Sequence, residues 1–291
     1  MPVLEDFVIA GRVNEVSEYS GMDSPMTSFD EEWTAAYPYK VDYKFNSRGL
    51  RDNEWPLENL DKHIWCFGDS FTVGLGSPRE HTWPFILSRK TGTPTLNCSM
   101  DGASNNWIAR RAVQVMQEIK PNVIVILWSF FHRRESANTK KTDEERRMHF
   151  DPPYWNVHMA MKDVDNFISC VNLVSLHRGQ TKIIHATIPH AMHFSRGVVL
   201  QMWEEIKDHS WPKCPEDLDS FSNLAPQLRE EIEQNYKDIH IALNEYYKYD
   251  SFVRGLDNFI GEVEQIDKAR DGFHFDIQTS SLFVHKIMSR L

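Results

Sequence analysis

Short apolar runs alternate with helical segments along most of this chain. The four clearest runs read HIWCFG, PTLNCS, NVIVILWS and TKIIHATI, at residues 63–68, 94–99, 122–129 and 181–188. The segments between them have the apolar spacing of helices, at residues 82–92, 104–120 and 159–179. Strands separated by helices in this order predict a parallel sheet that is covered by helices on both faces.

The predicted fold class is therefore α/β, a three-layer α/β/α sandwich around a mostly parallel sheet of about five strands. The candidate fifth strand is SFVRG, at residues 251–255. We expect helical segments near residues 198–207 and 226–248, and an amphipathic helix over residues 276–291.

The first 60 residues have a different character from the rest. They are rich in turn formers, and only Val41, Tyr43 and Phe45 alternate as in an edge strand. We expect residues 1–60 to be a lead-in that packs on a main domain spanning 61–291. That domain has insertions near 130–157 and 190–225. The first insertion is highly charged and follows the end of a strand, so we interpret it as a lid or a substrate-facing segment.

Composition excludes several classes of partner. The formal net charge is −10, which argues against a general binder of nucleic acid or anionic membrane. The N-terminus lacks the pattern of a secretory signal, and no window is apolar enough to span a membrane. The four cysteines form no C-x-x-C pair, so we expect reduced thiols and a cytoplasmic location. The sequence carries no signal for the oligomeric state.

The first apolar run stops at Gly68, Asp69 and Ser70. Such a stop is typical of a tight turn after a strand, and equally of a strand end that exposes one serine hydroxyl. Ligands of open parallel sheets bind outside the carboxyl ends of the strands. Small or polar residues follow the other strands too, at 101–105, 130–135 and 189–190. A serine on the first of these turns indicates an acyl-transfer pocket.

A serine nucleophile needs a base, and the base needs an orienting acid. One of the 13 histidines has a suitable neighbour, because Asp271 and His274 lie three residues apart on a predicted turn before the last helix. His274 could then take the serine proton while Asp271 holds the other ring nitrogen. The alternative is a helix cap followed by a surface histidine.

These residues resemble the motifs of the SGNH/GDSL serine hydrolases. The first block of that family, GDS plus an apolar residue, is similar to residues 68–71. The second block is similar to residues 97–102, in which Gly102 matches the oxyanion-hole glycine. The last block, D-x-x-H, matches Asp271 and His274. FNSRGLRD, residues 45–52, resembles an N-S-x-G-x-R stretch that often precedes the GDS strand in one branch.

The resemblance implies a flavodoxin-like esterase or acyl hydrolase without a metal or organic cofactor. Ser70 would attack the ester, His274 would act as base and then as acid, and Asp271 would orient the imidazole. The N–H groups of Ser70 and Gly102 would bind the oxyanion. The expected substrate is a small-molecule or carbohydrate ester, for example an O-acetyl group. The alternatives are an acyltransferase with the same triad and a non-catalytic binding or structural module.

The third block of the family departs from the pattern. It usually supplies an asparagine as a further oxyanion donor, whereas this chain reads LWSFFHRRE after the third strand. Losing such a donor typically costs about 2.7–4 kcal/mol of transition-state stabilisation. The candidate replacements, which are also the candidate substrate contacts, are Asn105, Asn106, Ser129, His132 and Arg133.

Three other features have a functional and a structural interpretation. Arg133 either faces the pocket and binds a carboxylate or sugar hydroxyl, or belongs with Arg134 and Glu135 to a solvated loop. His185, His190 and His193 lack metal-ligand spacing, so surface or pocket-lining roles are favoured over a metal site. Trp128 and Trp155 are either core residues or platforms for a sugar.

Overall fold

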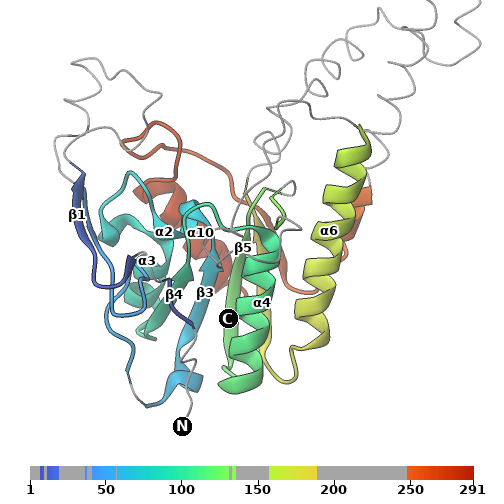
Figure 1. Cartoon of the computed structure of the whole chain (residues 1–291), viewed down its shortest axis with the longest axis horizontal. Coiled ribbons are helices and arrows are strands. Elements are labelled where there is room, and N and C mark those ends of the chain that lie inside the picture. The colour runs from blue at the N-terminus through green and yellow to red at the C-terminus, as the bar shows by residue number, and fades with distance from the viewer. Residues whose placement is uncertain are drawn as a thin grey trace, which may run out of the picture.

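The centre of the protein is a five-stranded parallel sheet (Figure 1). The computed structural model describes residues 7–9, 12–19, 37, 41–56, 58–130, 133–135, 157–188 and 248–291. The strands of this sheet are β3 (Ile64–Gly68), β4 (Thr95–Ser99), β5 (Val123–Trp128), β6 (Lys182–Thr187) and β7 (Phe259–Glu262). Their spatial order is β4-β3-β5-β6-β7, and every neighbouring pair is parallel. This flavodoxin-like order confirms the predicted fold class.

Helices cover both faces of the sheet. α4 (Asn105–Glu118) and α6 (Val157–Leu176) lie together on one side, while α3 (Trp83–Thr91) and α10 (Ile277–Met288) lie on the other (Figure 1). The described residues also include three single turns, α2 (Ser70–Val73) and the 3₁₀ turns η2 (Leu60–Lys62) and η3 (Arg79–His81), and a helical stretch at residues 248–254. The three predicted layers are therefore present.

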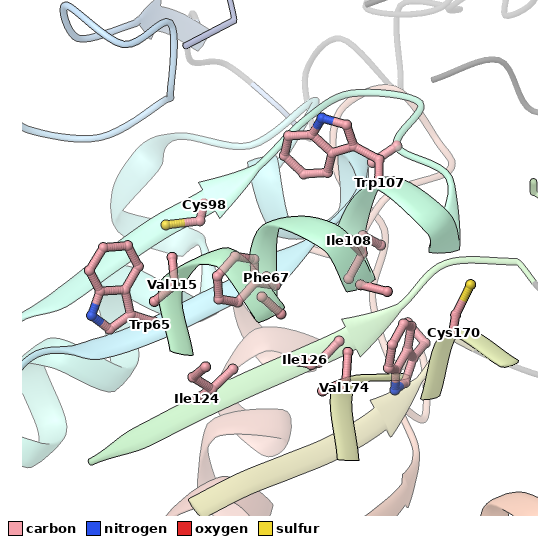
Figure 2. Close-up of a cluster of buried hydrophobic side chains, with 14 of the residues drawn as sticks. Trp65, Phe67, Cys98, Trp107, Ile108, Val115, Ile124, Ile126, Cys170 and Val174 are labelled. Carbon is pink, nitrogen blue, oxygen red and sulfur yellow. The ribbon is translucent and has the colours of Figure 1, made fainter. Parts of the chain in front are cut away.

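The alternation within β3 divides the interior into two cores. Trp65 and Phe67 point to the side of α4 and α6, where they join Ile108, Val115 and other apolar residues (Figure 2). Ile64 and Cys66 point the opposite way, into a core that α3 and α10 close. All five residues of β3 are buried, as expected for a central strand of a parallel sheet.

The predicted fifth strand at 251–255 is wrong. Residues 248–254 are helical, and the fifth strand is β7, which pairs with β6. Tyr249, Phe252, Val253 and Leu256 all belong to or pack against the first core. This spacing of three and four residues is helical, and a five-residue window is too short to reveal it.

The N-terminal part contributes a separate two-stranded sheet. β1 (Val16–Tyr19) pairs antiparallel with β2 (Val41–Lys44), so the predicted strand at 41–45 exists but lies outside the main sheet. Phe7 and Trp55 belong to the same buried cluster as Trp65 and Trp107. The ring of Phe7 lies 5.4 Å from that of Trp55 and 6.3 Å from that of Trp107. The first 60 residues thus contribute side chains to the main core.

Several predictions fall outside the described residues. They concern most of the insertions at 130–157 and 190–225, the helical segments near 198–207 and 226–248, and Cys214. Within the described ranges, no helix has both the length and the apolarity needed to cross a membrane. Cys66, Cys98 and Cys170 are free and buried. Burial raises the pKa of Cys66 and Cys98 well above the ordinary range and that of Cys170 to about 12.

Candidate active site

The predicted nucleophile lies at the edge of the sheet where ligands bind in this class of fold. The chain order of the strands reverses between β3 and β5, and the crevice outside their carboxyl ends is the usual binding position. Ser70 follows β3 as the first residue of α2, and Ser129 follows β5. The topology therefore places both residues at one crevice.

Local packing explains why the apolar run ends on Gly68, Asp69 and Ser70. A Cβ at Gly68 would lie 2.0 Å from Thr72 Oγ1 and 3.0 Å from the Leu127 carbonyl oxygen, so only glycine fits there. Asp69 caps α2, because its Oδ1 accepts a 3.0 Å hydrogen bond from the Phe71 N–H. Ser70 therefore begins a capped helical turn, and its side chain is largely buried.

The end of β5 holds the second carboxylate oxygen of Asp69. Asp69 Oδ2 accepts hydrogen bonds from Ser129 Oγ at 2.5 Å and from Arg133 Nη1 at 2.8 Å. The guanidinium of Arg133 also stacks 4.7 Å from the centroid of the Phe130 ring. Asp69 and Ser129 are fully buried, and the Arg133 side chain is only 12% exposed. Ser129 and Arg133 thus support the turn that carries Ser70.

Both candidate asparagines are engaged by the segment after β5. Asn105 donates from Nδ2 to the Phe130 carbonyl at 2.9 Å and accepts from the Ser129 N–H at 3.1 Å. Asn106 accepts from the Glu135 N–H at 3.0 Å and donates to Asn166 Oδ1 at 2.9 Å. The two side chains therefore bind the backbone at Ser129, Phe130 and Glu135.

The charged residues after Arg133 are paired with helices. Arg134 Nε lies 2.6 Å from Asp163 Oδ1, and Glu135 Oε1 lies 2.6 Å from Arg110 Nη1. Together with the pairing of Arg133 and Asp69, these contacts describe an anchored segment, in contrast to the solvated loop considered above. His132, the remaining candidate, lies outside the described residues.

The predicted pair of Asp271 and His274 is formed. Asp271 Oδ2 lies 2.5 Å from His274 Nδ1, while Asp271 Oδ1 accepts from the His274 N–H at 3.0 Å. Both residues are buried. Burial alone would raise the pKa of Asp271, but the hydrogen bonds and charge of His274 and the Phe273 N–H lower it below its ordinary value. A carboxylate beside Nδ1 favours the tautomer that carries a ring proton on this nitrogen.

The other ring nitrogen of His274 points away from Asp271 and is unpaired in the described part of the chain. Nε2 is buried and has no hydrogen-bond partner among the described residues, including Ser70. The imidazole packs against the neighbour of Ser70, with its centroid 4.6 Å from that of the Phe71 ring.

The two predicted oxyanion donors are available. Neither the Ser70 N–H nor the Gly102 N–H donates a hydrogen bond within the described part of the chain. Gly102 has a φ of 67°, and its turn follows β4, which pairs with β3 up to Gly68. A left-handed residue at this point favours glycine.

Two other sequence features belong to the core. Trp128 is fully buried and donates from Nε1 to His185 Nδ1 at 3.1 Å, with the two rings stacked. Burial lowers the pKa of His185 to about 4, so this ring stays neutral at pH 7. His190, His193 and Trp155 lie outside the described residues. Over the described ranges, no group of three or more His, Cys, Asp or Glu side chains could hold a metal.

A small cavity lies next to the end of α2 and the turn after β4. Its volume is about 90 Å³, and the N-terminal segment forms part of its wall. Its lining includes Val73, Leu75, Met100, Asp101 and Tyr43. A second cavity, of about 190 Å³, lies along the outer edge of β4 and is lined by Asp52 and Asn97 among others.

One structurally important residue was given no role by the sequence. Arg51, in the N-S-x-G-x-R-like stretch, is buried and binds carbonyl oxygens at the end of α2. The motif resemblance was the only signal for it, because an arginine in a turn-rich segment otherwise indicates a surface position.

Comparisons with known proteins found similar solved structures of low sequence identity. No family model matches the chain, and no curated protein matches it in sequence. Similar solved structures include a GDSL-like lipase from Bacteroides thetaiotaomicron, 15% identical, covering 79% of this chain and 87% of that one, with a TM-score of 0.37.

Two further similar structures are carbohydrate esterases by name. A family two carbohydrate esterase from Clostridium thermocellum is 13% identical and covers 81% of this chain and 65% of that one, with a TM-score of 0.38. An acetyl xylan esterase from Butyrivibrio proteoclasticus is 12% identical, with the same coverage and TM-score.

Proposed function

We propose that the protein is a serine esterase of SGNH type that cleaves a small ester. One observation carries this proposal: a buried Asp271–His274 pair leaves Nε2 without a partner and packs on the neighbour of Ser70. A base with one nitrogen held by a carboxylate and the other free has the arrangement that serine hydrolysis requires.

The chemistry follows from these groups. Ser70 Oγ attacks the ester carbonyl carbon while its proton passes to His274 Nε2. The bond from carbon to the alcohol oxygen then breaks, and His274 gives the proton to that oxygen as the alcohol leaves. Water attacks the resulting acyl-enzyme, again giving a proton to His274, and the carboxylic acid leaves as Ser70 regains its proton. Asp271 stabilises the imidazolium in each half.

The negative charge on the carbonyl oxygen needs hydrogen-bond donors. The N–H groups of Ser70 and Gly102 would supply two of them. Among the described residues, Arg133 is the best candidate for the oxyanion donor that the third block lacks. Its Nε–H is buried without a partner among the described residues, whereas Ser129 and Asn105 already donate to other groups.

The substrate class we propose is a short-chain ester. An acetyl ester is the first to test, and an O-acetylated carbohydrate is a natural example of such a substrate. The chemistry proposed for Ser70 and His274 requires no metal or organic cofactor.

Labelling with a fluorophosphonate tests the nucleophile directly. We expect the wild type to be labelled and to hydrolyse a short-chain p-nitrophenyl ester, and Ser70→Ala to lose both properties while keeping its circular dichroism spectrum. Ser88→Ala, on α3, is the matched control and should behave like the wild type.

The outcomes separate the candidate functions. A folded wild type without labelling or turnover would contradict the esterase and favour a binding module on the same fold. Labelling of Ser70 with transfer of the acyl group to an added alcohol, in preference to water, would indicate an acyltransferase.

A further inference from the structure

The turn at residues 74–77 connects the candidate nucleophile to the rest of the site. It follows α2 directly, and the Gly74 and Leu75 N–H groups donate to the Ser70 carbonyl at 2.9 and 3.2 Å. Gly74 and Gly76 have φ values of 77° and 74°, so both residues lie in the left-handed region of backbone conformation. A displacement of this turn would therefore be transmitted to Ser70.

The same turn packs on the segment that carries the acid and the base. The Arg270 N–H donates to the Gly76 carbonyl at 3.1 Å, and a Cβ at Gly76 would lie 2.8 Å from Asp271 Cγ. Ser77 Oγ donates to the Phe275 carbonyl at 3.1 Å, on the other side of His274. The 74–77 turn is thus in contact with the chain before and after the Asp271–His274 pair.

Arg51 holds this turn from the N-terminal segment. Its Nη1 donates to the carbonyls of Val73 at 3.1 Å and Gly74 at 2.5 Å, and its Nη2 donates to the carbonyl of Ser77 at 2.8 Å. The guanidinium is buried and lies 4.3 Å from the centroid of the Tyr43 ring. The Tyr43 hydroxyl in turn accepts from the Gly76 N–H at 2.7 Å.

A guanidinium suits this task better than any other side chain. Its planar fork spans both ends of the turn at once, and hydrogen bonds from a charged donor are stronger than neutral ones. A lysine ammonium is a single point on a flexible stem and cannot reproduce the fork.

We propose that Arg51 is a positioning residue that sets the placement of Ser70 relative to His274 by holding the 74–77 turn. The inference rests on the proposed function, because it assigns to Arg51 an effect on the reactivity of Ser70. Through Arg51, the N-terminal segment then takes part in positioning the catalytic residues.

Arg51→Lys tests this role against a merely structural one. We expect the rate of fluorophosphonate labelling and kcat for a p-nitrophenyl ester to fall roughly tenfold to a hundredfold, as for a misplaced catalytic group, with KM changed less than kcat. Arg111→Lys is the matched control, since Arg111 is also buried and stacked, over Phe7, but lies on α4 away from the turn. It should label and turn over at the wild-type rate.

A milder variant covers the case in which Arg51→Lys does not fold. Tyr43→Phe removes only the acceptor of the Gly76 N–H, and we expect a several-fold loss of labelling rate in a folded protein. A folded Arg51→Lys that labels at the wild-type rate would overturn the inference. If only Tyr43→Phe folds, a wild-type labelling rate in that variant would overturn it.

The two proposals fail in distinguishable ways. A wild type that is not labelled at Ser70 contradicts the esterase itself. A wild type that is labelled at Ser70, together with an Arg51→Lys variant that is labelled equally fast, contradicts only the role of Arg51.

Discussion

Asp271 acts on His274 through both of its carboxylate oxygens. One oxygen contacts Nδ1 and the other accepts the main-chain N–H, so position and tautomer of the ring are set together. In Asp271→Asn we expect kcat to fall roughly 10⁴-fold, because an amide favours the wrong tautomer. Ester turnover measures this, and Asp165→Asn, exposed on α6, is the control that should retain activity. A fully active Asp271→Asn would remove Asp271 from the mechanism.

The same carboxylate contributes to stability as a function of pH. Its pKa in the folded state lies below the ordinary value of 3.8, so the folded state favours the ionised form. The stabilisation is therefore complete above about pH 4 and is lost as the pH falls through the folded-state pKa. The Asp271→Asn variant should lack the loss of stability that protonation of Asp271 causes in the wild type at acidic pH.

At the scale of elements, α6 carries Asp163, a carboxyl group whose ionised form is destabilised by burial. Burial raises the pKa of Asp163 to about 6, and the hydrogen bond and charge of Arg134 offset only part of that cost. Between pH 3.8 and about 6 the folded state therefore holds a proton that the unfolded state has released. The contribution of Asp163 to stability thus falls as the pH rises through this window.

Asp163→Asn tests this consequence because asparagine does not titrate. Relative to the wild type, the free energy of unfolding of the variant should increase by about 1 kcal/mol between pH 5 and pH 7. Urea unfolding at the two pH values measures the difference. If the variant and the wild type differ in free energy of unfolding by the same amount at pH 5 and pH 7, Asp163 does not have the raised pKa.

At the scale of the whole molecule, the N-terminal segment shares a core with the sheet. Phe7 is 1% exposed and packs between Trp55 and Trp107, which belong to the lead-in and to α4. Phe7→Ala should lower the free energy of unfolding by about 3–5 kcal/mol, as large truncations in a core do. Denaturant unfolding followed by tryptophan fluorescence and by circular dichroism should give one coincident transition.

Val13→Ala is the control for that measurement. Val13 is 40% exposed in the same segment, so its truncation should change stability little. Two separate transitions in the wild type, or a negligible effect of Phe7→Ala, would mean that the lead-in folds independently of the sheet.

Some of the candidate site could be predicted because its signals are local. Ser70 sits on a turn whose cap and glycine lie within three residues of it, and Asp271 contacts His274 across three residues. The side chains of Asn105 and Arg133 could not be assigned in the same way. Their partners come from other elements, so the sequence left both as candidate ligand contacts.

The sequence by itself determined the alternation of strands and helices, the end of β3 shortly before Ser70 and the pairing of Asp271 with His274. Periodicity and short-range hydrogen bonds decide these features, and both can be followed within a few residues. Only the tertiary structure decided that β7, and not residues 251–255, is the fifth strand at the edge of the sheet. It also decided that Arg51 holds the turn after α2. Such features depend on which distant surfaces must be buried together, and that choice is made by packing of the whole chain.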